Sequence, residues 1–136
     1  ADIIAGFPGE TDADFDDSFA LLHDSPVCFT HVFKYSERRG SAASRLPEKT
    51  DPAAASVRSE RLRELGAVKL RAFQGRHLGR RVEVLFEDRR NTTWRGRTGN
   101  YLEVAVHCAE DLTNRLRRVV LDGIDGELMT GTLTEM

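Results

Sequence analysis

The loop after the first apolar segment has the residue types of a ligand-binding turn. Residues 6–11 (GFPGET) follow the apolar residues 2–5, which predict a buried strand. The glycines permit backbone angles that other residues avoid, and the proline removes a hydrogen-bond donor. In folds with parallel strands, ligands bind at the carboxyl ends of strands, and free N–H groups at the next helix start attract anions. The segment therefore predicts either a ligand cradle or an ordinary tight turn.

A second group of functional side chains lies in the C-terminal part of the chain, where arginines are interleaved with aromatic residues. Arginine forks bind phosphates and stack on bases, and aromatic rings provide stacking platforms. The pattern predicts either an RNA-binding rim or an ordinary solvated rim with its aromatic rings in the core. The residues are Arg89, Arg90, Trp94, Arg95, Arg97, Asn100, Tyr101, Arg115, Arg117 and Arg118.

The histidines and cysteines form no recognisable motif. The four histidines have no metal-ligand spacing with one another or with Cys28 and Cys108. There is no Gly-x-Ser-x-Gly or other nucleophile signature. The acids of residues 10–17 are better explained as stabilising the positive end of a helix. No catalytic residue and no metal ligand is therefore assigned.

The composition is that of a soluble globular protein. Among 136 residues, 20 Lys and Arg face 22 Asp and Glu, so the net charge of −2 gives no sign of nucleic-acid or membrane binding. Residues 1–27 nevertheless hold seven acids and no Lys or Arg, so the charge is unevenly spread. No apolar run approaches the roughly 18 residues of a membrane span. Two widely spaced cysteines predict a reduced, cytoplasmic setting.

Elements alternate between strand and helix in the first half. Thr11 is expected to cap a helix over residues 12–23, with Asp14 completing a weak capping box. A second strand is expected over residues 29–33, and strand, helix and strand in succession predict a parallel βαβ unit.

A polar loop over residues 34–50 leads to one long amphipathic helix over residues 52–73. The stripe with a period near 3.6 consists of Val57, Arg61, Leu62, Leu65, Val68, Lys69 and Phe73. After Gly75 the pattern alternates at period two. Five short strands are expected over residues 81–87, 93–97, 101–106, 118–121 and 127–131. They predict a small antiparallel barrel, with a domain boundary near residue 76.

Two motifs resemble the end of the radical S-adenosylmethionine barrel of methylthiotransferases. Residues 2–15 (DIIAGFPGETDADF) resemble a late strand and helix of that barrel. Residues 31–43 (HVFKYSERRGSAA) resemble its last strand, at a fitting distance along the chain. Residues 53–76 are similar to the helix that leaves the barrel. Residues 77–136 resemble the family's C-terminal TRAM domain, a small OB-like RNA-binding barrel.

Within the family, residues 84–87 (VLFE) and 96–104 (GRTGNYLEV) are most similar to the branch that acts on N6-threonylcarbamoyladenosine in tRNA. The resemblance implies a cytoplasmic transferase that adds a methylthio group at C2 of that adenosine, next to the anticodon. It implies S-adenosylmethionine and two 4Fe-4S clusters as cofactors. It also implies tRNA, held at the anticodon stem-loop, as partner, and no membrane.

The sequence departs from the family in its cysteines. Thiolates hold the family's clusters, and Cys28 and Cys108 match none of the cluster ligands. The chain begins with Ala1 and opens directly on a predicted strand. We therefore expect a fragment that is inactive alone, with the cluster cysteines in a missing N-terminal part of the same polypeptide.

The resemblance assigns some residues to the pocket. A border of the S-adenosylmethionine or substrate pocket is implied for Gly6, Gly9 and Glu10. The loop after the last barrel strand matches at Tyr35, Ser36, Arg38 and Gly40, with Ser41 in place of the usual Thr. Of these, Tyr35, Ser36 and Arg38 are the implied substrate contacts. Arg38 is the best candidate to hold a charged substrate group, because its fork suits phosphate or carboxylate.

The resemblance assigns others to RNA. Contacts are implied for Arg97, Asn100 and Tyr101, with Arg89 and Arg90 on phosphates; Trp94 is either core or stacking platform.

The expected fold class is α/β plus all-β, with three segments. Residues 1–50 are the C-terminal βαβ portion of a (β/α) radical S-adenosylmethionine barrel, residues 51–76 a connecting helix, and residues 77–136 a five-stranded antiparallel OB-like barrel. Alternatives are a free-standing RNA-binding module, a methylthiotransferase acting on isopentenyladenosine, and a non-catalytic interaction protein.

Overall fold

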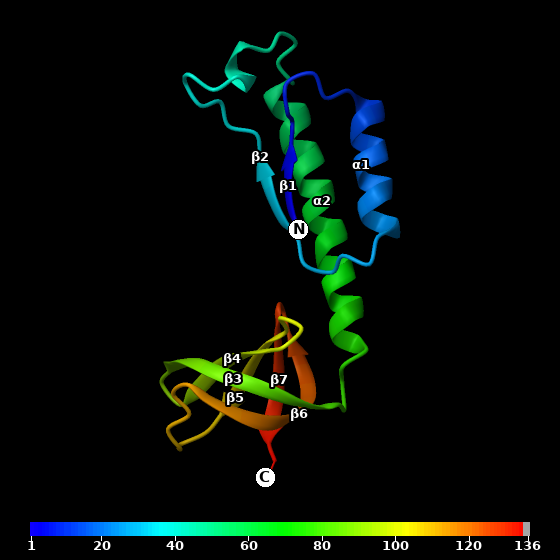
Figure 1. Ribbon diagram of the computed structural model, residues 1–136. Helices are drawn as coiled ribbons and strands as arrows, with labels where there is room; N and C mark the ends of the chain where they lie inside the picture. The colour runs from blue at the N-terminus through cyan, green and yellow to red at the C-terminus, as the bar shows by residue number, and fades with distance from the viewer. Residues whose placement is uncertain (135–136) are drawn as a thin grey trace. The chain divides into compact units, whose positions relative to one another are not determined.

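The computed structural model describes residues 1–134, which form two compact units, residues 1–70 and the residues from Arg71 onward (Figure 1). The division falls within the long helix α2 (Pro52–Gly75). The three predicted segments, with limits at residues 50 and 76, stay a prediction. No helix in the described part of the chain is long and apolar enough to cross a membrane.

The first unit contains the predicted βαβ arrangement. β1 (Asp2–Ala5) and β2 (His31–Lys34) pair in parallel, and α1 (Asp12–Asp24) connects them. A single 3₁₀ turn, η1 (Ala43–Arg45), interrupts the polar loop that leads to α2. The core of this unit consists of Ala5, Phe15, Leu22, Leu62 and Leu65. The radical S-adenosylmethionine barrel as a whole stays an expectation.

The buried face of α2 differs from the predicted stripe. Val57 and Val68, both assigned to that stripe, are 62% and 66% exposed. In the first unit the buried positions of α2 are Ala55, Arg58, Ser59, Leu62, Leu65 and Gly66. They share one face of the helix, each three or four residues from another member. The prediction is wrong at the two valines and at the exposed Arg61, because the packed face is offset from the predicted stripe and includes the polar residues Arg58 and Ser59.

Close approach of the backbones explains which face of α2 packs. A Cβ on Gly6 would collide with the Cβ of Ala55, and a Cβ on Gly66 would collide with the hydroxyl of Thr30. Small residues of the helix, Ala55 and Gly66, thus permit its closest approaches to the rest of the unit. Hydropathy alone does not reveal such contacts, because glycine and alanine contribute little to an apolar stripe.

The second unit is a closed five-stranded barrel. Its strands are β3 (Arg81–Arg90), β4 (Thr93–Thr98), β5 (Glu103–His107), β6 (Arg115–Asp125) and β7 (Leu128–Leu133). Their order around the barrel is β3-β4-β5-β7-β6. The interior is filled by Val84, Phe86, Trp94, Val104, Val106, Val119, Leu121 and Met129. Five strands in the predicted region are thereby confirmed.

The barrel is not antiparallel throughout. β5 and β7 pair in parallel, through Val104 with Met129 and Ala105 with Thr130, whereas every other neighbouring pair is antiparallel. The predicted all-antiparallel barrel is wrong for a geometric reason. Strand directions cannot alternate around a closed ring with an odd number of members, so five strands require at least one parallel pair.

Candidate cofactor loop and candidate nucleic-acid surface

The backbone N–H groups of the loop after β1 donate hydrogen bonds within the loop and to Glu48. The Gly6 N–H donates to Glu10 Oε1 (3.1 Å), and the Glu10 N–H donates to the Phe7 carbonyl (3.0 Å). The Gly9 N–H donates to the carbonyl of Glu48 (2.9 Å). Gly6 and Gly9 adopt left-handed φ angles of +78° and +84°. These three N–H groups are already satisfied, so they are not free donors for an anion.

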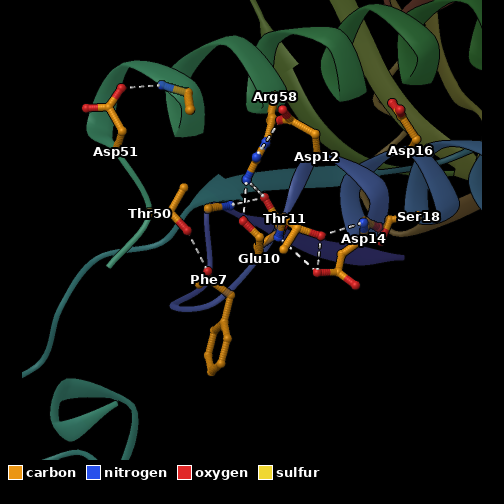
Figure 2. Close-up of polar contacts among 12 residues, drawn as sticks. Phe7, Glu10, Thr11, Asp12, Asp14, Asp16, Ser18, Thr50, Asp51 and Arg58 are labelled. Atoms are coloured by element: carbon orange, nitrogen blue, oxygen red, sulfur yellow. Dashed lines mark hydrogen bonds and ion pairs between the residues drawn. The ribbon is translucent and has the colours of Figure 1, made fainter. Parts of the chain in front are cut away.

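Arg58 on α2 fixes the position of this loop by hydrogen bonds (Figure 2). Its Nη1 donates to Glu10 Oε1 (2.7 Å) and to the Glu10 carbonyl (3.0 Å), and its Nη2 donates to Asp12 Oδ1 (2.7 Å). The side chains of Arg58 and Glu10 are 9% and 14% exposed. The bonds to Asp12 and then to Glu10 raise the pKa of the guanidinium. Glu10 therefore holds the loop instead of offering a free carboxylate.

The predicted capping box at the start of α1 is confirmed. The Asp14 N–H donates to Thr11 Oγ1 (3.2 Å), and the Thr11 N–H donates to Asp14 Oδ2 (2.9 Å). The Thr11 hydroxyl also donates to Asp14 Oδ2 (2.6 Å). Donation from the Thr11 hydroxyl and then from its backbone lowers the pKa of Asp14. Asp14 therefore caps the helix by hydrogen bonds; stabilisation of the helix dipole by the other acids stays a prediction.

The loop after β2 lies beside the loop after β1. The Tyr35 N–H donates to the Ala5 carbonyl (2.8 Å), and the ring of Tyr35 meets that of Phe7 edge-on at 5.4 Å. Among the described residues, the buried hydroxyl of Tyr35 has no hydrogen-bond partner. Ser36 and Arg38 are exposed. The structure thus brings the two predicted pocket loops together at the carboxyl ends of β1 and β2.

On the barrel, the arginines predicted to contact RNA already have carboxylate or carbonyl groups of the protein as partners. Arg97 pairs with Glu103 (2.7 Å), and hydrogen bonding to that carboxylate raises the pKa of Arg97. Arg90 lies 3.7 Å from Asp88. Arg89 donates from Nε to the Asn91 carbonyl (2.8 Å) and covers the ring of Trp94. A phosphate would compete with Glu103 for Arg97 and with Asp88 for Arg90.

Trp94 belongs to the core. It is 3% exposed, and its Nε1–H donates to the carbonyl of Glu110 (2.9 Å). The sequence left open whether this ring is a stacking platform; its burial under Arg89 excludes that role in this structure.

Tyr101 lies exposed on a turn that is held by hydrogen bonds. It is 70% exposed and adopts a left-handed φ of +66°. The Thr98 hydroxyl donates to Asn100 Oδ1 (2.5 Å) and accepts from the Leu102 N–H (3.0 Å). Asn100 Nδ2 lies 3.1 Å from His77 Nε2. Because the turn is fixed on both sides, the Tyr101 ring is held outward at little further entropic cost.

Two important residues were missed by the sequence reasoning. Arg58 is a charged residue within the buried face of α2, between Ala55 and Leu62. Its position, three residues after Ala55 and four before Leu62, could have identified it if the buried face of the helix had been predicted correctly. His77 had no local signal, because its partner Asn100 is remote in sequence.

Metal ligation has no basis among residues 1–134. They contain no group of three or more His, Cys, Asp or Glu side chains placed to hold a metal ion. Both cysteines are free and half-buried, Cys28 in the first unit and Cys108 in the second.

Comparison with known proteins supports the resemblance seen in the motifs. No protein-family model matches the chain. The threonylcarbamoyladenosine tRNA methylthiotransferase MtaB of Rickettsia prowazekii (strain Madrid E) is 42% identical over 91 residues, or 65% of this chain. The chain spans about a fifth (21%) of the length of that relative. It is therefore similar to a threonylcarbamoyladenosine tRNA methylthiotransferase, the family and branch that its motifs predict.

Proposed function

We propose that this chain is part of a tRNA methylthiotransferase acting on N6-threonylcarbamoyladenosine next to the anticodon. The observation that carries the proposal is the 42% identity to MtaB. The second unit binds the tRNA at its anticodon stem-loop, and the first unit contributes part of the wall of the cofactor and substrate pocket. The setting is cytoplasmic.

The residues present do not fit the two 4Fe-4S clusters that the family implies. Such clusters need several thiolates at one place, and Cys28 and Cys108 lie in separate units. We propose that the cluster ligands belong to the rest of the polypeptide. Ile4 and Phe33, each 54% exposed on the two-stranded sheet, support this proposal, because further barrel strands would cover them.

We propose that S-adenosylmethionine approaches the first unit at Gly9. Gly9 is exposed, and no heavy atom lies within 4 Å of the position a Cβ would take. A cofactor can therefore approach the backbone there. Gly6 and Glu10 act by fixing the loop. Tyr35, Ser36 and Arg38 face the substrate, with Arg38 on a charged group.

The RNA role is tested by measuring the affinity of the chain for an unmodified anticodon stem-loop across salt concentrations. Phosphate contacts predict that the logarithm of affinity falls linearly with the logarithm of salt. Tyr101→Ala should weaken binding about ten-fold, because a stacked base is worth about 1–3 kcal/mol. Arg63→Ala, on α2 in the first unit, is the matched control and should leave binding unchanged. Binding that is absent, or independent of salt, would contradict the proposal.

The catalytic role requires the whole polypeptide. Reading the gene upstream should reveal a Cys-x-x-x-Cys-x-x-Cys motif roughly 100–150 residues before Ala1, given barrels of about 250 residues. Its absence would favour a free-standing RNA-binding module. With the full enzyme, tRNA carrying threonylcarbamoyladenosine should gain the methylthio group and tRNA carrying isopentenyladenosine should not.

A further inference from the structure

A groove opens on the barrel exterior where β5 and β7 separate. The two strands pair only at Val104 with Met129 and at Ala105 with Thr130, while β7 continues along β6 as far as Leu133. The groove has a volume of about 370 Å³. That volume lies within the range of small-ligand pockets. Its lining includes Ala105, His107, Asp122, Thr130 and Thr132.

One side of the groove offers hydrogen-bond acceptors. Asp122 Oδ1 accepts from the Thr130 hydroxyl (2.9 Å), and Asp122 Oδ2 accepts from the Thr132 hydroxyl (2.9 Å). The irregularity in β6 between Leu121 and Gly123 places Asp122 at this point. The hydroxyl protons of Thr130 and Thr132 are both donated to Asp122. The oxygen atoms of these three side chains can therefore still accept hydrogen bonds, but the two hydroxyls cannot donate another. This side suits a ligand that donates, such as a hydroxyl or an amine.

Next to the groove, on the neighbouring strand β4, lies an unpaired positive charge. Arg95 on β4 lies opposite Ala105 on β5, and Ala105 lies opposite Thr130 on β7, so the three side chains share one row on one face. Arg95 is half-buried, and its guanidinium makes no hydrogen bond or ion pair with any described residue. Its buried Nε is unpartnered. The carboxylate across the strand pair, Asp88, lies near Arg90 instead.

Burial makes this arginine unusual on the barrel. An unpaired half-buried guanidinium costs desolvation free energy, which an anionic ligand recovers through charge-assisted hydrogen bonds. Arg97, the next outward residue of β4, already has Glu103 as its partner. Arg95 is therefore better placed than Arg97 to receive a phosphate.

An aromatic ring completes the lining. His107 is exposed, and its Nδ1 lies 3.0 Å from the Thr93 hydroxyl, which fixes the ring plane. Imidazole rings stack on unpaired RNA bases.

We propose that this groove (Ala105, His107, Asp122, Thr130 and Thr132), together with Arg95 beside it on β4, binds one nucleotide of single-stranded RNA. Arg95 holds its phosphate, Asp122 accepts a hydrogen bond from its ribose 2′-hydroxyl, and the base lies against His107. A ribonucleotide carries the anion and the hydroxyl donor together, which matches the two sides of the row. The inference rests on the proposed RNA-binding function and adds the site and the means of telling RNA from DNA.

The test compares binding of the full chain to single-stranded ten-nucleotide oligoadenylate and to its deoxy counterpart. The native chain should prefer the RNA. Arg95→Ala should weaken RNA binding about five- to ten-fold and reduce the salt slope by about 0.7, the value of one single-strand phosphate contact. Arg81→Ala, an exposed arginine on β3, is the matched control and should change neither by as much. If Arg95→Ala fails to fold, Arg95→Gln takes its place, because it keeps the side-chain stem. It should show the same loss of RNA affinity and the same reduction in salt slope.

The second arm addresses the 2′-hydroxyl. Asp122→Asn should lower the preference for RNA over DNA while leaving the salt slope unchanged, because the charge on Arg95 is intact. The proposal that the groove binds a nucleotide is overturned if Arg95→Gln and Arg81→Ala weaken RNA binding equally. It is also overturned if Asp122→Asn leaves the preference for RNA over DNA intact. Binding of the stem-loop without binding of oligoadenylate overturns the groove alone. Binding of neither RNA defeats the proposed function as well.

Discussion

At the scale of single residues, the loop after β1 depends on Arg58. Its guanidinium joins α2 to the carboxylates of Glu10 and Asp12 and to the Glu10 carbonyl. Glu10 in turn receives the N–H of Gly6, which lies against Ala55. One side chain from a distant part of the sequence thus determines the shape of the proposed pocket border.

Arg58→Ala is expected to destabilise the first unit by about 2 kcal/mol or more, because it leaves the poorly exposed Glu10 carboxylate without its cation. Urea denaturation followed by circular dichroism measures this. Arg61→Ala removes only a half-exposed guanidinium from the rings of Phe15 and Phe19 and should cost less than about 1 kcal/mol. Equal losses for the two variants would contradict the role given to Arg58.

At the scale of elements, α1 begins with a charge-dependent cap. The pKa of Asp14 is lowered by Thr11, so its carboxylate form is favoured in the folded state. A carboxyl group whose pKa is lower in the folded chain stabilises the fold above its unfolded pKa. That contribution is lost as the pH falls through the folded value.

The helix is therefore expected to lose part of its stability as the pH falls below about 4, the ordinary pKa of an aspartate. Asp14→Asn should remove this part of the acid dependence, and Asp17→Asn, further along α1, serves as the control. Denaturation midpoints between pH 6 and pH 3 provide the measurement. Parallel pH profiles for the native chain and Asp14→Asn would be inconsistent with the cap.

The barrel's tightest backbone contact lies between β3 and β4. Gly96 stands opposite Phe86, and a Cβ there would collide with the carbonyl oxygen of Leu85. Backbone atoms cannot move aside as a side chain can, so the strand pair itself would have to shift.

Gly96→Ala should lower the free energy of unfolding of the barrel by about 1–3 kcal/mol, the usual cost of overpacking. Gly99→Ala is the matched control, because no heavy atom lies within 4 Å of its Cβ position. Thermal denaturation distinguishes them. A Gly96→Ala variant as stable as Gly99→Ala would show that β3 and β4 are not so closely apposed.

At the scale of the whole molecule, the two units differ in how their strands are protected. In the barrel each strand has a neighbour on both sides, because the sheet closes. β1 and β2 have only each other within the described residues, and a two-stranded sheet relies on the helices packed against it.

Amide hydrogen exchange should therefore be slower in the barrel strands than in β1 and β2, since protection follows the free energy of local opening. Mass spectrometry of peptic peptides resolves the two regions. Equal protection in both would argue that the first unit is complete and stable as it stands.

Patterns within the sequence are enough to predict the local elements and the family resemblance. Thr11 and Asp14 predict the start of α1 because a capping box depends only on residues three apart, and the five barrel strands follow from period-two alternation. These are short-range properties. The GFPGET and GRTGNYLEV segments likewise needed no structure to indicate a methylthiotransferase.

Which side chains have hydrogen-bond or ion-pair partners follows from the packing of the folded chain. Arg58 contacts Glu10, and Asn100 contacts His77, although the members of each pair are remote in sequence. Arg95 has no partner among the described residues. The parallel β5–β7 pair, and the groove beside it, likewise follow from closing five strands into a ring. Pairing of distant residues depends on the packing of whole elements, which no local pattern specifies.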